Sequence, residues 1–139
     1  MPIEPDDICY NKAAIIERTL RRLKEEYSFD PELQNFTHID AMVLNVERAC
    51  QAAIDLAGHL TAQYHLGIPQ NSAEAFQLLA KNGLLSKETA QAMVAMTGFR
   101  NIAIHEYQTL DMQILRAIAT ERWQSLVKFC RELGMNIEP

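Results

Sequence analysis

The sequence is poor in the residues that interrupt regular structure. It has only five glycines and five prolines among 139 residues, which argues against a loop-rich or disordered chain. It also nearly lacks the alternation of Val, Ile and Thr that strands require, whereas helix-favouring Ala, Leu, Glu, Gln and Arg fill long stretches. Apolar residues make up 48% of the chain, enough for a real core. We therefore expect an all-α protein.

Cysteine is scarce and scattered. The three cysteines, Cys9, Cys50 and Cys130, form no C-x-x-C pair, so their spacing indicates neither a disulfide framework nor a zinc knuckle. Nucleotide-binding glycine motifs and the H-E-x-x-H zinc motif are also missing, which leaves no support for a cofactor or a bound metal. We expect the cysteines to be buried as small apolar residues.

Long apolar runs and a signal segment are absent too. No stretch approaches the ~20 apolar residues of a membrane span, and the acidic first residues lack the hydrophobic region of a signal peptide. A cytoplasmic protein is expected. The net charge of −5 counts against broad, non-specific binding of nucleic acid, because such proteins are usually basic. It leaves room for a small RNA-cleaving site, which needs only a local cluster of cations.

Apolar residues recur at helical spacings of three and four in five segments. These segments span residues 7–27, 36–65, 73–81, 87–99 and 112–133. Residues that favour N-caps precede four of them: Asp6 or Asp7, Ser72, Ser86 and Asp111. Gly98 is expected to weaken the end of the fourth helix. Short connections between about five helices predict an antiparallel bundle, and the length predicts a single domain over residues 1–139.

Most of the side chains suited to catalysis gather between Gly98 and Tyr107. Histidine has an unperturbed pKa near ~6.5, so His105 can act as an acid or a base at neutral pH. The Arg100 guanidinium offers a fixed fork of donors to phosphate oxygens. Asn101 can add a donor to phosphate or ribose, and Tyr107 can stack on a base or bind phosphate. These residues suit RNA cleavage without a metal, in which the 2′-hydroxyl attacks the phosphate.

The spacing of Arg100 and His105 poses a geometric problem. Each helical residue advances about 100°, so residues five apart point roughly 140° apart on one regular helix, whereas Arg100 and Tyr107 share a face. Two arrangements can bring Arg100 and His105 together. One is a kink near Gly98, and the other is a two-fold axis that places Arg100 beside His105 of the partner subunit.

Structural roles compete with functional ones at several positions. An interhelical histidine is usually a hydrogen-bonded structural residue, and an arginine near a helix end often meets the last carbonyls. Asp55 and His59 have the i, i+4 spacing of a metal pair, but without a third ligand a hydrogen bond is the simpler explanation. Glu47 can orient a group of the site or be merely solvated. We expect exposed positions for His38 and His65, and an ordinary solvated face for the basic residues Arg18, Arg21, Arg22 and Lys24.

Residues 100–107, Arg-Asn-Ile-Ala-Ile-His-Glu-Tyr, fit the R-x4-H-x-Y motif of the HepT family in the HEPN superfamily. The sequence resembles this family elsewhere as well. Residues 45–57 resemble its second helix, residues 68–76 the entry to its third helix, and residues 96–99 the approach to the motif. The resemblance is therefore chain-wide, and the motif shows no departure from the family pattern.

The resemblance implies a dimeric, metal-independent endoribonuclease toxin with an RNA substrate, in which Arg100 and His105 are catalytic. It also implies a partner antitoxin, a minimal nucleotidyltransferase (MntA-like), with which the homodimer can form a higher assembly. In such pairs the antitoxin transfers AMP from ATP to the motif tyrosine, here Tyr107. The added adenylate would bring bulk and negative charge to the place of the RNA phosphate and would compete for Arg100.

Two other functions stay open at this point. A non-catalytic helical adaptor would bind a nucleotidyltransferase and present its substrate, and unlike a toxin it would be harmless when expressed alone. A plain dimerisation module would leave Arg100, His105 and Tyr107 scattered and exposed instead of lining one cleft. A helical bundle by itself does not decide among these functions, because one fold serves many of them.

Overall fold

The computed structural model describes residues 3–105 and 111–139, with the backbone alone described at 101–105. Every regular element in these ranges is helical, which confirms the expected all-α class. Along the described chain the elements are α1 (Asp7–Phe29), α2 (Phe36–Gln63), α3 (Ser72–Lys81), α4 (Lys87–His105), α5 (Met112–Ala117), the π-helical η2 (Ile118–Arg122) and α6 (Gln124–Glu132).

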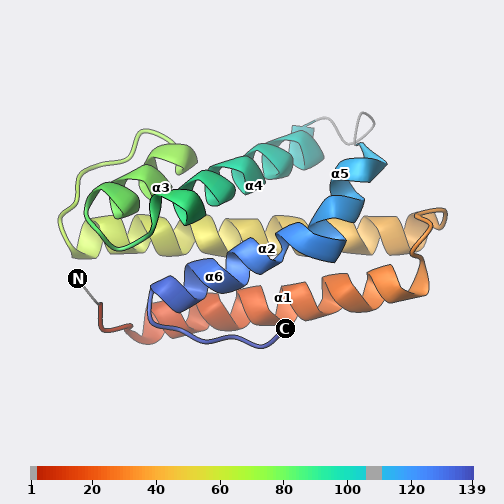
Figure 1. Ribbon diagram of the computed structural model, residues 1–139, viewed down its shortest axis with the longest axis horizontal. Helices are drawn as coiled ribbons and strands as arrows, with labels where there is room; N and C mark the ends of the chain where they lie inside the picture. Colours follow the sequence, from red (N-terminus) through yellow and green to blue (C-terminus); the bar gives the residue numbers. More distant parts are fainter. Residues whose placement is uncertain (1–2, 106–110) are drawn as a thin grey trace.

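The long helices form an antiparallel bundle. Figure 1 shows α2 lying between α1 and α4, and both neighbours contact it. The C-terminal segments α5, η2 and α6 follow one another as a rod that crosses in front of α2 (Figure 1), and its parts pack against α1 and α4. The arrangement expected from short connections between amphipathic helices is confirmed.

A single apolar core joins the helices. On α1, the fully buried side chains Ile16, Leu20 and Leu23 are spaced by four and three residues, as expected for a helix with one apolar stripe. Phe76 of α3 and Phe129 of α6 meet edge to face, with ring centroids 5.6 Å apart, an arrangement that aromatic pairs favour. This contact ties the short α3 to the C-terminal rod.

The cysteines match the expectation from composition. Cys9, Cys50 and Cys130 are buried and unpaired. Burial raises the pKa of the Cys130 thiol to about 12, so this thiol stays protonated and unreactive at neutral pH. Within the described ranges, none of the helices combines the length and the apolar character needed to cross a lipid bilayer.

Side-chain caps begin the helices, with one correction. Asp6, Ser86 and Asp111 accept backbone N–H groups at the starts of α1, α4 and α5, at 2.8–3.1 Å, as expected. The cap of α3 is Asn71, whose side-chain oxygen accepts the Glu74 N–H at 2.8 Å. The prediction that Ser72 caps this helix is therefore wrong. Asn and Ser are nearly equivalent as N-caps, so the sequence does not decide which of the two neighbours begins α3.

Two helix ends also differ from expectation. α2 ends two residues earlier than expected, at Gln63, because His65 has a left-handed backbone with a φ of 55°. α4 continues through Gly98 to His105 instead of weakening there. A glycine inside a helix costs only about 1 kcal/mol relative to alanine, and the buried Met96 and Phe99 hold the helix on the core on both sides of it.

The expected single helix over residues 112–133 contains a π-helical segment. The Trp123 N–H donates to the Ile118 carbonyl at 3.1 Å, five residues back instead of four. This wide turn shifts the register by one position. Ile118 stays buried, Arg122 stays exposed, and Trp123 takes the half-buried position facing the core. The Lys24 ammonium lies 4.4 Å from the centre of the Trp123 ring, which adds a cation–π contact.

Candidate functional site

The motif begins where α4 is packed against α2. Met93, Met96 and Phe99 are buried on one side of α4, and the half-buried Arg100 follows directly. The Cys50 thiol of α2 donates a hydrogen bond to the Met96 carbonyl at 3.7 Å. This bond holds the two helices together one turn before Arg100, so the start of the motif is fixed by packing.

The charge of Arg100 reaches the buried Cys50 thiol. Burial raises the pKa of Cys50 to about 12, Arg100 opposes this increase, and Glu47 adds to it. Arg100 and Glu47 therefore act on the same part of the α2–α4 interface, with opposite signs. A thiol with so high a pKa stays protonated at neutral pH, which rules out Cys50 as a nucleophile.

The remaining motif residues are placed in part. Asn101 and His105 contribute their backbone to α4, and Tyr107 lies outside the described residues. α4 is a single helix from Lys87 to His105, and Gly98 does not interrupt it. At about 100° per residue, the positions of Arg100 and His105 are about 140° apart around the helix axis.

A groove of about 470 Å³ lies beside this end of α4, and we call it the α4–α5 groove. Gly98 and Phe99 line it from α4, and Asp111, Ile114 and Arg122 line it from the C-terminal rod. A Cβ atom added at Gly98 would meet nothing within 4 Å. The groove therefore gives a ligand access to α4 two residues before Arg100.

A second and larger groove, of about 610 Å³, lies between α1 and α2. Its basic lining residues are Lys12, Arg18, Arg22 and Arg48, and we call it the α1–α2 groove. Arg18 and Arg22 are exposed, as expected for a solvated face, but both line this groove. Arg22 also pairs with glutamates of its own helix. The i, i+4 spacing of Arg18 and Arg22 was visible in the sequence, whereas their approach to Arg48 was not.

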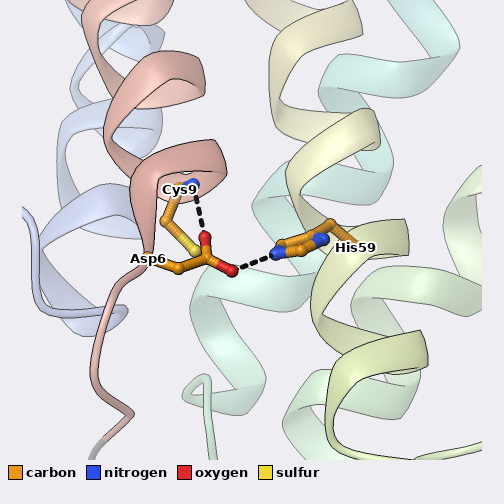
Figure 2. A group of neighbouring side chains, drawn as sticks. All are labelled: Asp6, Cys9 and His59. Carbon is orange, nitrogen blue, oxygen red and sulfur yellow. Dashed lines mark hydrogen bonds and ion pairs between the residues drawn. The ribbon is translucent and has the colours of Figure 1, made fainter.

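The expected hydrogen bond between Asp55 and His59 is absent, because His59 has a different partner. Figure 2 shows Asp6 between Cys9 and His59. The His59 Nε2 atom lies 2.8 Å from one Asp6 carboxylate oxygen, and the Cys9 backbone N–H donates to the other at 2.9 Å. Asp55 instead pairs with Lys12 at 3.4 Å.

The Asp6, Cys9 and His59 side chains offer three metal-ligand atoms within 4.8 Å of one another. Hydrogen bonds already account for this cluster. The Cys9 N–H, helped by His59, lowers the pKa of Asp6 to about 2, so the carboxylate is charged and both its oxygens are engaged. Burial raises the pKa of Cys9, which disfavours the thiolate that a metal would need. We interpret the cluster as a helix cap that ties α1 to α2.

His38 is not exposed, contrary to expectation. It is half-buried, its Nδ1 atom lies 2.5 Å from a Glu26 carboxylate oxygen, and its ring stacks on Phe29 with centroids 5.7 Å apart. These contacts close the α1–α2 turn. His65 is exposed, as expected.

Comparison with known proteins gives a consistent result. Residues 15–133 match the family described as ribonuclease HepT-like. The chain is 38% identical over 125 residues to the mRNA nuclease HepT of Shewanella oneidensis, which covers 89% of this chain and 94% of that protein. It is 32% identical over 120 residues to the tRNA nuclease HepT of Aphanizomenon flos-aquae, covering 84% of this chain and 81% of that protein.

Solved structures agree with the sequence matches. The tri-AMPylated Shewanella oneidensis HEPN toxin in complex with MNT antitoxin aligns with a TM-score of 0.88 at 36% identity, over 93% of this chain and 98% of that one. A toxin–antitoxin crystal structure with AMP-PNP aligns with a TM-score of 0.89 at 35% identity, over 94% of this chain and 100% of that one. The similarity in fold extends over nearly the whole chain.

Proposed function

The chain belongs to the HepT-like ribonuclease family, and we propose that it is a metal-independent endoribonuclease toxin in which Arg100 and His105 are catalytic. The observation that carries this proposal is the R-x4-H-x-Y motif at the end of α4. The described helices share one core, which supports one helical domain over residues 1–139. The RNA substrate and the unpaired cysteines favour action in the cytoplasm.

The motif residues supply what RNA cleavage needs. The 2′-hydroxyl of RNA forms the new bond to phosphorus while the bond to the 5′ oxygen breaks. The imidazole of His105 can take the hydroxyl proton or protonate the departing oxygen. The guanidinium of Arg100 can bind the non-bridging oxygens as charge builds on the phosphate. Asn101 and Tyr107 would support the bound ribose, base or phosphate.

The continuity of α4 favours a site shared by two copies of the chain. Arg100 and His105 are about 140° apart on one helix, so a single chain does not readily direct both at one phosphate. A two-fold axis solves this because the same surface supplies both halves of two sites. We infer a homodimer in which Arg100 works with His105 of the partner subunit.

Digestion of RNA in the presence of EDTA tests the catalytic assignment. We expect cleavage by the purified protein without added metal, and a loss of about 10²–10⁴-fold for Arg100→Ala and for His105→Ala. Circular dichroism would show whether both variants stay folded. Full activity of either folded variant would remove that residue from the mechanism. Expression of the chain alone adds a second distinction, because a non-catalytic adaptor would not arrest growth.

A mixed dimer tests the shared site. Co-expression of Arg100→Ala and His105→Ala chains with different tags allows the heterodimer to be purified. If each site combines the two subunits, one of the two sites is intact, and we expect about half of the wild-type activity. If each site lies within one chain, both are damaged and the heterodimer is as inactive as either variant homodimer.

The solved relatives also support a partner. The Shewanella oneidensis toxin is tri-AMPylated and bound to MNT antitoxin. We propose that this chain likewise binds a minimal nucleotidyltransferase antitoxin, which transfers AMP from ATP to Tyr107, and that a higher assembly results. The adenylate would place a negative charge where the RNA phosphate binds. Incubation with the transferase and ATP should raise the mass of the Tyr107 peptide by one adenylate, and the Tyr107→Phe chain should lack this change.

A further inference from the structure

The α1–α2 groove is a local excess of positive charge in an acidic chain. Lys12, Arg18 and Arg22 border it on α1, and Arg48 borders it on α2. Asp55 is the one acidic residue among those that line it, while the net charge of the chain is −5. Four cations around one depression attract an anion even when the whole protein does not.

Two of these cations have no partner among the residues that the structure describes. Lys12 and Arg22 are held in ion pairs with carboxylates of the same two helices, at 2.7–3.4 Å. Arg18 and Arg48 form no hydrogen bond or ion pair within the part of the chain that the structure describes, and both are exposed. One guanidinium on each wall is therefore available to an anion that enters the groove.

The floor of the groove points to the chemical class of the anion. Ile15 and Ala52 line it together with Leu44, which is 43% exposed although it is apolar. A nucleotide brings both parts that such a surface requires, a phosphate for the guanidinium forks and a flat base or sugar face for the apolar floor. A carboxylate-rich protein surface would satisfy only the cations.

The groove and the motif share one segment of α2. Arg48 precedes Cys50 by two residues, and Cys50 is the residue that bonds to α4 at Met96. The charge of Arg100 acts on the same Cys50 thiol. Arg48 and Cys50 are neighbours along α2, but their side chains point about 160° apart around its axis, so the groove and the motif lie at a similar level on different sides of α2.

We propose that the α1–α2 groove binds the phosphate backbone of single-stranded RNA, with Arg18 and Arg48 as positioning residues. This inference rests on the proposed ribonuclease function and assigns it a substrate-binding surface. Arg18 and Arg48 touch phosphates away from the bond that breaks, so they contribute to binding rather than to the chemical step.

Binding of an uncleavable RNA tests the groove without any catalysis. A fluorescent, single-stranded 2′-O-methyl RNA lacks the attacking hydroxyl, and anisotropy gives its affinity for the full chain. For Arg18→Ala/Arg48→Ala we expect affinity about tenfold weaker. The slope of log K against log salt should become shallower by about 1.4, because each phosphate contact on a single strand contributes about 0.7.

A matched control removes the same charge elsewhere. Lys128 and Arg131 are cations on α6, outside the groove, and Lys128→Ala/Arg131→Ala makes the net charge equally more negative. We expect this control to keep the wild-type salt slope. Equal losses in both double variants would show a general charge effect and would overturn the proposal. Matching thermal melts would show that the double variants are folded.

Cleavage kinetics separate this proposal from the proposed function. With cleavable RNA, Arg18→Ala/Arg48→Ala should raise KM about tenfold and leave kcat near the wild-type value. If the chain cleaves no RNA, the ribonuclease assignment fails even when the groove binds the 2′-O-methyl probe. If RNA binding is unchanged in the variant while capture of the transferase antitoxin is lost, the groove is a protein-docking surface and the RNA proposal is wrong.

Discussion

The two ends of α4 are held in different ways, although they belong to one unbroken helix. At the N-terminal end, Ser86 caps the helix, and the Glu132 carboxylate of α6 accepts hydrogen bonds from the Ser86 N–H at 2.6 Å and the Thr89 hydroxyl at 2.5 Å. At the other end, Arg100 and His105 carry the motif. The N-terminal end of α4 is held by hydrogen bonds that stabilise the fold, and the C-terminal end carries the side chains suited to binding phosphate.

The middle of α4 connects the two ends mechanically. Met93, Met96 and Phe99 are buried, and the Cys50 thiol bonds to the Met96 carbonyl. A helix positions side chains more rigidly than a loop does. The buried half of α4 holds the fold, and the motif half carries the candidate catalytic side chains. The comparison therefore predicts that a substitution in the buried half lowers stability without changing cleavage by the molecules that remain folded.

The largest effect is expected from the buried middle of α4. Met93→Ala should lower the free energy of unfolding by about 2–5 kcal/mol, because Met93 is 1% exposed and its loss leaves a cavity in the core. Urea unfolding measures this change. Gln91→Ala, at an exposed position two residues before Met93, should change stability by less than about 0.5 kcal/mol. Cleavage per folded Met93→Ala molecule should stay near wild type, and a parallel collapse of activity would contradict the division of α4.

A smaller effect is expected at the N-terminal end. Glu132→Gln should lower the free energy of unfolding by about 1 kcal/mol, because it weakens the hydrogen bonds that the carboxylate accepts. The effect is modest because Glu132 is partly exposed. Partial burial opposes ionisation of Glu132, but the bonds from Thr89 and Ser86 outweigh it and lower its pKa below the ordinary 4.5. The stabilisation is therefore present above pH 4.5 and is lost as the pH falls below it.

Thermal melts of wild type and Glu132→Gln between pH 3 and pH 7 measure this dependence. The difference in Tm should be constant near neutral pH and should shrink in acid. Glu121→Gln is the control, because it removes the same charge at an exposed position of the C-terminal rod. A difference that grows in acid would mean that the pKa of Glu132 is raised in the folded protein.

Much of the fold was predictable because it depends on local signals. The caps Asp6, Ser86 and Asp111 and the apolar stripes are readable within a few residues of sequence, and the structure confirms them. The π-helical segment was not predictable, because Ile118 and its neighbours keep an acceptable α-helical spacing. The choice of His59 for Asp6, 53 positions away, depends on how α1 meets α2, which no local pattern contains.

The site was predictable in its residue types but not in its geometry. The motif names Arg100 and His105, and their roles follow from the chemistry of a guanidinium and an imidazole. Their separation of about 140° around α4 favours the proposed site between two chains, and a two-fold axis would leave no periodic signal in a sequence. The approach of Arg18 to Arg48 was hidden for the same reason, since each lies on its own helix and only packing brings the two together.

The smallest effect is expected at the boundary between the two halves of α4. Gly98 is helical, and a Cβ atom there would meet nothing within 4 Å. Gly98→Ala should therefore raise the free energy of unfolding by about 0.5–1 kcal/mol. Gly58→Ala in the last third of α2 is the matched control, since its Cβ atom would also meet nothing within 4 Å, and it should give a similar gain outside α4. If Gly58→Ala stabilises the protein and Gly98→Ala destabilises it, α4 bends at Gly98 in solution. A bend would make a site within one chain possible again, and the mixed dimer of Arg100→Ala and His105→Ala chains would then be inactive.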